Sequence, residues 1–300
     1  MLIEEKVIEG FRVNVTSING MLLGIACDIG PRILYLASAK KPDLNIFGIL
    51  PNVGIETQDG FWKVYGGHRL WSSPQAKPRT YSIDDQPVKI DVGEDYITIH
   101  GNPEEKNFIQ KEITIKAGPD NSVQVIHRIK NIGRWPIRMA CSAISLMREK
   151  GFVIIPIKPT KIDAEGLLPG RHITLWPYTD ISDKRLIFSS DYIFVKHDPK
   201  VKDPLKIGVN ANPSWTAYWV DGMLFLKQFY QESGEYPDFG STVEVYADEH
   251  MLELGTLSVL KLVEPSEAIE HTEFWKVFEI GKIKVKPDNI SEKVEPLVKA

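Results

Sequence analysis

The sequence contains little cysteine and no cysteine or histidine cluster of the kind that holds a metal ion. Its 300 residues include two cysteines, Cys27 and Cys141, which lie far apart in apolar stretches. A disulfide framework is therefore excluded, and we expect two buried free thiols, with a single disulfide as the alternative. No CxxC or HExxH pattern occurs. We expect no zinc site and no cofactor, although scattered carboxylates could still hold a calcium ion.

Signatures of nucleotide binding and of serine nucleophiles are also missing. The chain has no GxxxxGKS/T loop, no GxGxxG turn and no Gly-x-Ser-x-Gly elbow, so nothing in it indicates a nucleotide site or a serine hydrolase. Positive charge is not in surplus either, since 36 Lys and Arg stand against 40 Asp and Glu, a net charge of −4. Because neutralising phosphates requires a basic stripe or surplus, nucleic acid is not the expected partner.

Long hydrophobic runs are absent. No apolar stretch approaches the roughly 20 residues that cross a bilayer. The segment Met1–Lys6 has neither the basic part nor the apolar part of a secretory signal. We therefore expect a cytoplasmic protein that does not contact a membrane. Only seven glutamines accompany many Lys, Glu and Ile residues, a composition that favours a thermophilic source.

Helical periodicity is scarce, whereas apolar and polar residues alternate repeatedly. The alternation covers 96–100, 112–116, 122–128 and 241–246, and turns rich in Gly, Pro and Asn separate such runs. Short alternating runs at this rhythm predict antiparallel strands in a sandwich or barrel. Twenty prolines and 22 glycines are spread evenly, so no linker divides the chain. We predict one large all-β domain over 1–280, followed over 281–300 by a C-terminal strand (at 282–286) or a mobile tail.

The most unusual stretch, 65–74, combines two glycines with His68, Arg69 and Trp71. In an extended strand His68 and Leu70 share one face, while Arg69 and Trp71 share the other. A guanidinium beside an aromatic ring suits a polyol, because the ring covers the C–H face and the guanidinium donates to hydroxyls. The alternative is a turn and a strand in which Trp71 is core and Arg69 pairs with a carboxylate.

A second stretch, 227–246, places polar side chains among aromatic residues. It contains Lys227, Tyr236, Asp238 and Glu244 on predicted strands and a tight loop. A positioned Lys, Tyr or Asp there could act as an acid, a base or a hydroxyl ligand. The alternative is an ordinary loop that joins two strands.

A third stretch, 253–277, contains five carboxylates and one histidine. Glu253 and His271 are its candidates for acid–base chemistry. Residues 269–274 alternate as a solvated strand face does, which is the alternative interpretation for His271. His127 lies in another alternating strand and is interpreted as a surface or core histidine.

A series of short motifs follows in a fixed order between residues 20 and 280. The motifs are Gly30-Pro31-Arg32-Ile33, Asn45-Ile46-Phe47, Gly66-Gly67-His68-Arg69-Leu70-Trp71, Tyr236-Pro237-Asp238, Val243-Glu244-Val245-Tyr246, Leu262-Val263-Glu264-Pro265 and Glu270-His271-Thr272-Glu273. Together they resemble an uncharacterised branch of the galactose-mutarotase-like (aldose 1-epimerase-like) superfamily. The resemblance implies a supersandwich, a large antiparallel β-sandwich whose concave face binds carbohydrate.

Mutarotases of this superfamily interconvert the anomers of an aldose with a base that takes the O1 proton and an acid that protonates the ring oxygen. The resemblance implies a Glu base on a late strand and a His acid on a middle strand. Here the late strand, 223–229, has Lys227 or Gln228 at the Glu position, and the middle strand, 139–145, has no histidine. Arg69 matches the family's substrate-binding arginine. The resemblance therefore carries the fold over better than the chemistry.

We therefore predict a carbohydrate-binding protein, with an aldose 1-epimerase-like isomerase as the enzyme hypothesis. The alternatives are a non-catalytic carbohydrate-binding or sensor module and a structural protein that has lost the pocket. The candidate catalytic residues are His68, Lys227, Asp238 and Glu253, and the candidate substrate-binding residues are Arg69, Trp71, Tyr236, Glu244 and His271. The expected partner is a small-molecule carbohydrate, and the expected assembly is a monomer or a homodimer.

Overall fold

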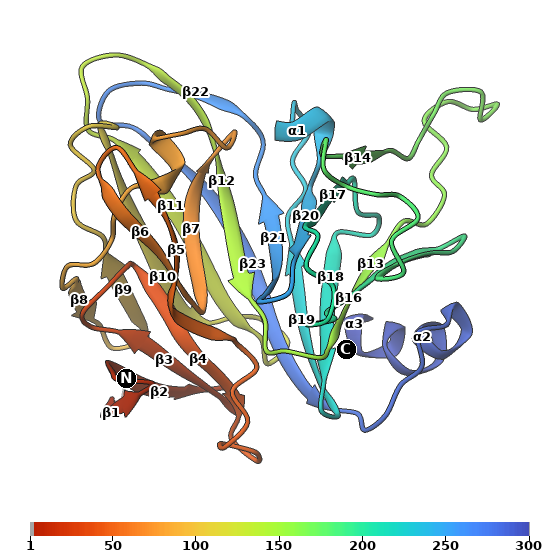
Figure 1. The fold of residues 1–300 in the computed structure, drawn as a ribbon, viewed down its shortest axis with the longest axis horizontal. Helices are drawn as coiled ribbons and strands as arrows, with labels where there is room; N and C mark the ends of the chain where they lie inside the picture. The colour runs from red at the N-terminus through yellow and green to blue at the C-terminus, as the bar shows by residue number, and fades with distance from the viewer. Residues whose placement is uncertain (1–2, 300) are drawn as a thin grey trace.

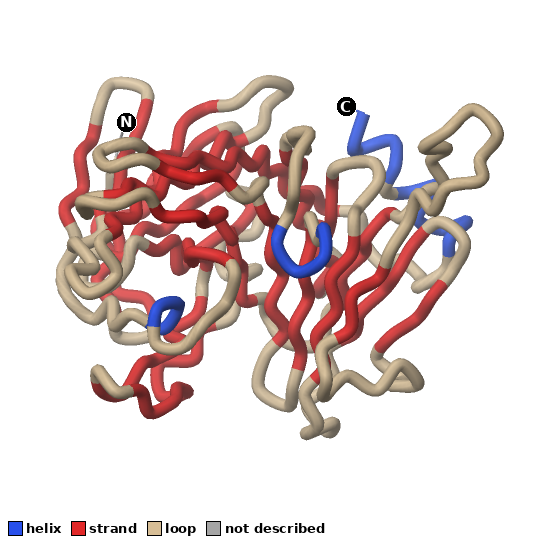
Figure 2. Tube along the Cα trace, turned by 90° about the horizontal axis from the view of Figure 1, so that it is seen from above, coloured by secondary structure: helices blue, strands red, loops and turns tan. Residues whose placement is uncertain are grey.

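Two large sheets of antiparallel strands face each other in the computed structural model, which describes residues 3–299 (Figure 1). Strands make up 51% of the chain and helices 6%. Figure 2 shows the same balance, with strands forming the body of the molecule and helices only short pieces. The prediction of an all-β antiparallel sandwich is therefore confirmed.

The two sheets are built from segments far apart in the chain. The first sheet runs in the order β1 (Glu4–Ile8), β2 (Phe11–Ile18), β3 (Met21–Ala26), β4 (Arg32–Ser38), β7 (His68–Ser73), β12 (Ile137–Leu146), β21 (Leu252–Leu257), β20 (Val243–Ala247), β17 (Leu205–Val209) and β14 (Ile173–Leu175), with β22 (Lys261–Val263) paired to β12. The second sheet runs in the order β15 (Leu186–Phe188), β16 (Tyr192–Lys196), β13 (Phe152–Pro156), β18 (Trp215–Val220), β19 (Met223–Phe229), β23 (Ala268–Glu279), β11 (Val123–Asn131), β10 (Ile109–Ala117), β9 (Tyr96–His100) and β8 (Lys89–Val92).

The main core lies between these sheets and follows from the alternation of apolar residues. Ile113 and Val125 of the second sheet and Ile207 and Leu254 of the first belong to one buried cluster, and each is fully buried. Their chain neighbours point to the opposite face of each sheet, because successive side chains on a strand alternate. Each inner strand therefore has a core face and an outer face.

A hairpin covers the outer face of the first sheet. It consists of β5 (Ile49–Thr57) and β6 (Gly60–Gly66), and Trp62 and Val64 from it pack with Leu146 of β12. Gly66 and Gly67 join the hairpin to β7 with φ angles of 103° and 66°. A Cβ at either position would lie 2.4 Å or less from a carbonyl oxygen, so both positions require glycine. This turn brings the aromatic residues of β6 over β7.

Two short C-terminal helices, one 3-10 turn and the four-residue turn labelled α1 complete the described residues 3–299. The 3-10 turn η1 (Arg79–Tyr81) follows β7, and α1 (Pro237–Gly240) precedes β20. The C-terminal segment forms α2 (Pro287–Lys293) and α3 (Glu295–Lys299), and no strand is present at 282–286. Ile283, Ile290 and Val294 are buried in a second apolar cluster on the outer face of the second sheet. The C-terminal segment therefore packs as helices where a strand or a tail was expected.

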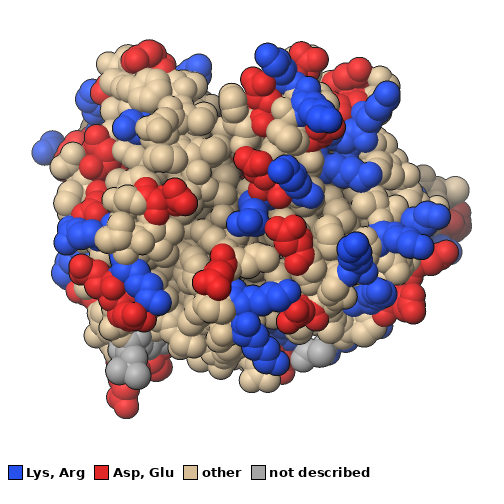
Figure 3. Space-filling view, turned by 60° about the horizontal axis from the view of Figure 1, so that its bottom comes forward, with Lys and Arg blue, Asp and Glu red and all other residues tan. Residues whose placement is uncertain are grey.

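Other sequence-based expectations concern thiols, charge and membrane spans. Both cysteines are free; Cys141 is buried, as predicted, whereas Cys27 is only partly buried. Lys and Arg side chains are interspersed with Asp and Glu on the face shown in Figure 3. No helix within residues 3–299 is both long enough and apolar enough to cross a bilayer.

Candidate functional site

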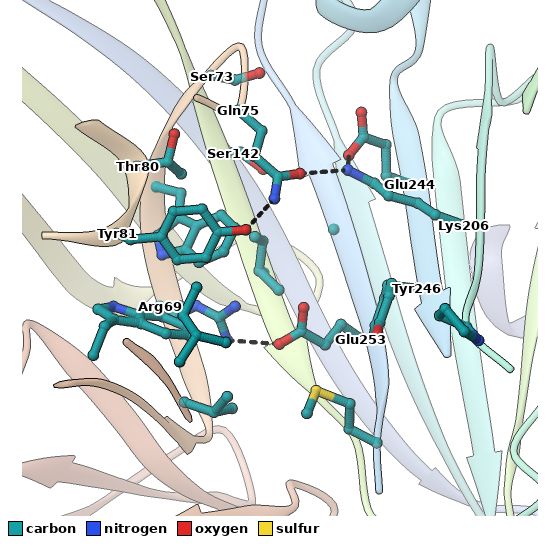
Figure 4. Close-up of a pocket in the computed structure, with 18 of the residues that line it drawn as sticks. Arg69, Ser73, Gln75, Thr80, Tyr81, Ser142, Lys206, Glu244, Tyr246 and Glu253 are labelled. Atoms are coloured by element: carbon teal, nitrogen blue, oxygen red, sulfur yellow. Dashed lines mark hydrogen bonds and ion pairs between the residues drawn. The ribbon is translucent and has the colours of Figure 1, made fainter. Parts of the chain in front are cut away.

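A cavity of about 500 Å³ opens on the outer face of the first sheet. Its floor is formed by β7, β12, β21, β20 and β17, and the β5–β6 hairpin and η1 form one wall. The alternation predicted for β7 holds, because Arg69 and Trp71 line this pocket whereas Leu70 packs in the core between the sheets. Figure 4 shows Arg69 and Tyr81 on one side, Lys206 and Glu244 on the other, and Glu253 between them.

Arg69 is held between aromatic rings and a carboxylate. Its Cζ lies 4.5 Å from the ring centre of Trp71 and 5.6 Å from that of Trp62. Its Nη1 lies 2.8 Å from Oε1 of Glu253. Tyr81 completes the wall, with its ring centre 5.2 Å from those of both tryptophans. The wall thus combines apolar ring surface with a buried guanidinium, whose Nε and Nη1 have no hydrogen-bond partner within residues 3–299.

The opposite wall carries a lysine and two carboxyl groups. Nζ of Lys206 lies 2.7 Å from Oε2 of Glu244, donates to Oε1 of Gln75 at 3.3 Å, and lies 4.1 Å from the ring centre of Trp176. Burial raises the pKa of Glu244 to about 8, an effect that Lys206 opposes and Asp238 increases. A carboxyl group whose pKa is raised in this way has the acidity that general acid catalysis near neutral pH requires.

Five of the nine candidate residues lie together in this pocket: Arg69, Trp71, Asp238, Glu244 and Glu253. The other four, His68, Lys227, Tyr236 and His271, are not among its lining residues. His68 alternates with Arg69 and therefore points into the core, where Lys227 on β19 and His271 on β23 are also buried. Tyr236 is buried beside the loop, and its hydroxyl donates to the carbonyl of Glu232.

Three of the candidates outside the pocket, His68, Lys227 and His271, belong to a buried polar cluster behind the pocket floor. At its centre, Nζ of Lys227 lies 2.7 Å from Oε1 of Glu273, and both side chains are fully buried. Oε1 also accepts from Thr256, and Oε2 accepts from the indole of Trp275 at 2.7 Å. Lys227 donates further to Ser145 Oγ at 3.3 Å. Every charge in this pair therefore has hydrogen-bond partners, as a buried ion pair requires.

Three histidines extend the cluster, and their hydrogen bonds determine their tautomers. His127 Nδ1 donates to the carbonyl of His271, so the neutral ring accepts at Nε2, 2.6 Å from Nε2 of His68. His68 then donates at Nε2 and accepts at Nδ1 from Ser145 Oγ, 2.9 Å away. Thr256 donates to Glu273, so His271 donates at Nε2 to Thr256. All three rings are neutral in this arrangement.

Within residues 3–299, this cluster also contains a group of three side chains of the types that bind metal ions. Ligand atoms of His68, His127 and Glu273 lie within 4.8 Å of one another. Two nitrogens bound tetrahedrally to zinc at its usual bond lengths would be about 3.3 Å apart, whereas the two imidazole nitrogens are 2.6 Å apart. That separation and the complete hydrogen bonding describe a proton-sharing pair, so these residues do not fit a zinc ion as they are arranged.

Acidification is expected to destabilise the protein through these histidines. Burial lowers the pKa of His68, His127 and His271, for His271 from 6.5 to about 3. Below pH 6.5 the unfolded chain therefore binds protons that the folded chain does not. The free energy of unfolding should therefore decrease as the pH is lowered below 6.5, by about 1.4 kcal/mol per pH unit for each histidine affected.

Urea titrations at successively lower pH would measure this slope. His271→Gln keeps an amide donor for Thr256 and removes one titrating ring, so its slope should be smaller by about one proton. The exposed ring of His250 is the matched control, and His250→Gln should leave the slope unchanged. An equal slope in wild type and His271→Gln would contradict the neutral assignment.

Several pocket residues were not among the sequence candidates. They are Trp62, Gln75, Tyr81, Tyr178, Lys206 and Tyr246. A usable signal exists for Lys206, because it interrupts the buried run of Leu205, Ile207 and Val209 at the outward position. Tyr178 lies on an irregular segment and Tyr81 in the short turn η1, so only the folded chain brings them to the pocket.

No family model matches the chain, and no curated protein matches it. Solved structures do match. A galactose mutarotase-like protein from Lactobacillus casei is 8% identical, covers 89% of this chain and 100% of its own, and superposes with a TM-score of 0.55. A proposed mutarotase from Salmonella typhimurium is 7% identical and covers 93% of this chain and 94% of its own, with a TM-score of 0.59.

A TPR-domain containing protein from Parabacteroides distasonis is 12% identical over 92% of this chain, with a TM-score of 0.57. The chain spans only 49% of that protein's length. Identities this low indicate shared architecture and say nothing about shared chemistry. The chain has the galactose-mutarotase-like fold.

Proposed function

We propose that the pocket binds a carbohydrate and that the protein is an aldose 1-epimerase-like isomerase. One observation carries the proposal: Arg69, stacked on Trp71, faces the Glu253 carboxylate inside a cavity of about 500 Å³. Aromatic rings cover the C–H face of a sugar. A guanidinium donates hydrogen bonds to sugar hydroxyls, and a carboxylate accepts hydrogen bonds from them. The galactose-mutarotase-like fold of the chain supports the same ligand class.

Anomerisation requires a base near O1 and an acid near the ring oxygen. Glu253, which is paired with Arg69, is the proposed base. As it takes the O1 proton, the bond between C1 and the ring oxygen breaks, the C1–O1 bond becomes a carbonyl, and the ring oxygen takes a proton. Reclosure on the other face of the carbonyl returns both protons and gives the other anomer. No group has to be added or removed.

A second candidate function is carbohydrate binding without chemistry. It is favoured by the 2.8 Å contact between Arg69 and Glu253, because a carboxylate that pairs with a guanidinium can hold a sugar in place without taking part in proton transfer. Proton NMR of freshly dissolved α-anomers separates the two functions. Decay of the α signal faster than the spontaneous rate supports the isomerase. Unchanged decay with selective line broadening supports a binding module, and neither effect with neutral and acidic sugars contradicts both functions.

Arg69→Lys is expected to weaken binding of the sugar that gives the NMR response. Lysine keeps the charge but loses the planar fork and the stacking on Trp71. Loss of hydrogen bonds from a charged donor should raise the dissociation constant about 10- to 100-fold. Arg148, an exposed arginine paired with Asp221 outside the pocket, supplies the control Arg148→Lys. Equal affinities for the two variants would place the sugar elsewhere.

A further inference from the structure

Two carboxyl groups in the pocket face each other without a donor between them. Glu244 is 8% exposed, and its Oε2 accepts from Lys206 at 2.7 Å. Its Oε1 and the Oδ2 of Asp238 are both buried without a hydrogen-bond donor within residues 3–299. Both side chains line the same pocket. Thr174, which donates to the Asp238 carbonyl, pairs with Gly208, and Gly208 pairs with Glu244 on the next strand. Asp238 therefore lies beside Glu244 and adds to the effect of burial, which raises the pKa of Glu244. Two ionised carboxylates offer only acceptors, so a proton is required to satisfy both oxygens.

The backbone around Asp238 holds its carboxyl group in place. Asp238 has φ 50° and ψ 55°, and Phe239 has φ 59°. These are left-handed backbone conformations, which residues other than glycine rarely adopt. The carbonyl of Asp238 accepts from Ser241 Oγ at 2.8 Å and from Thr174 Oγ1 at 3.1 Å. Strained backbone that is fixed by such contacts is characteristic of functional sites.

Charge balance at this wall is consistent with a single retained proton. The ionisable groups nearest to Glu244 are Lys206 on β17, Asp238 on α1 and Tyr178 on the segment after β14. Burial raises the pKa of Tyr178 to about 12, so this phenol is neutral. One lysine cation then faces two carboxyl groups, and one proton on the pair brings the net charge of the buried group to zero.

We propose that Asp238 and Glu244 share one proton at neutral pH and that this pair is the proton donor of the pocket. The role as proton donor rests on the proposed isomerase function, whereas the shared proton does not. The register supports it, because Glu244 pairs with Gly255 and Tyr246 with Glu253 on the next strand. Glu244 and Glu253 are thus diagonal neighbours on the pocket face, with Cβ atoms about 7 Å apart.

In the reaction, Glu253 takes the O1 proton and the pair gives its proton to the ring oxygen as the bond from C1 to that oxygen breaks. Glu253 is then protonated and the pair is doubly ionised. On reclosure the pair takes the proton back from the ring-oxygen hydroxyl as that oxygen attacks C1, while Glu253 returns its proton to O1. The enzyme ends each cycle in its starting protonation state.

Infrared spectroscopy of the whole protein tests the shared proton independently of any sugar. Wild type should show the C=O band of a protonated carboxyl at neutral pH, disappearing as pH rises through about 8. Glu244→Gln should remove this band. Asp238→Asn should shift its titration to lower pH, because a negative neighbour is removed. Glu264→Gln, at an exposed site between β22 and β23, should leave it unchanged.

The α-anomer decay assay tests the donor role. Glu244→Gln should slow the catalysed decay by about 10²- to 10⁴-fold while sugar line broadening persists. Absence of the band in wild type, or its persistence in Glu244→Gln, would overturn the shared proton. A band without any catalysed decay in wild type would instead overturn the isomerase function and the donor role together, leaving the protonated pair established. Full activity of Glu244→Gln would overturn the donor role alone.

Discussion

Replacing Lys227 with methionine is expected to lower the free energy of unfolding by about 3–5 kcal/mol. Lys227 and Glu273 are both fully buried and 2.7 Å apart. Burial lowers the pKa of Lys227, and Glu273 only partly offsets this. Burial alone would raise the pKa of Glu273, but the charge and hydrogen bond of Lys227 oppose it, and the pKa lies below its usual value. Without the ammonium group, Glu273 remains in the core either as an uncompensated charge or as an acid protonated at a cost.

Urea unfolding of the single and double variants measures the effect. Lys227→Met/Glu273→Gln should recover most of the loss, because the neutral amide oxygen can accept from the indole of Trp275 while its NH2 group donates to the hydroxyl of Thr256. The exposed pair Lys41–Glu279 has the same 2.7 Å separation, so Lys41→Met is the matched control and should cost about 0–1 kcal/mol. Equal losses in the single and double variants would show that the two buried charges are not coupled.

The strand architecture could be predicted because alternation is a local property. The residues that flank a position decide which face of a strand it occupies, and the opposite orientations of Arg69 and Leu70 follow directly. Their assignment to a pocket and to a core also follows once aromatic rings and a guanidinium share one face. The resemblance to galactose-mutarotase-like proteins rested on short ordered motifs, and the fold it implied is the one observed.

The placement of Lys227 was not foreseen, although a signal was present. Lys227 shares its strand face with Phe225 and Phe229, which are buried in the core. The strand phase therefore points Lys227 inward, against the general preference of lysine for solvent. Its partner Glu273 lies on another strand, and only the pairing of β19 with β23 aligns them, with Lys227 opposite Trp275. Buried ion pairs of this kind require tertiary information.

The C-terminal helices were missed for a different reason. Pro287 occupies the first turn of α2, and Ile290 and Val294 are four residues apart on one helical face. The helices are short, so their periodic signal extends over barely two turns and is masked by surrounding Lys and Glu residues. Their apolar face is buried only because the outer face of the second sheet offers Ile154 and Leu226 to cover.

Glu253→Gln is expected to reduce the catalysed anomerisation rate by about 10²- to 10⁴-fold. The amide keeps the size of the side chain and loses the charge that pairs with Arg69, whose Nη1 lies 2.8 Å from Oε1. It cannot take the O1 proton, so the base is lost while the wall of the pocket is retained. Decay of α-anomer NMR signals at saturating sugar measures the rate, and line broadening measures binding.

The distinction between base and structural partner depends on two further comparisons. Arg69→Gln removes the guanidinium and leaves Glu253 in place, so binding should weaken while the remaining bound sugar still reacts. Glu264→Gln changes an exposed carboxylate outside the pocket and should leave both rate and binding unchanged. A role of Glu253 in binding alone would lower the affinity in Glu253→Gln and leave the rate at saturating sugar unchanged, which would contradict its assignment as the base.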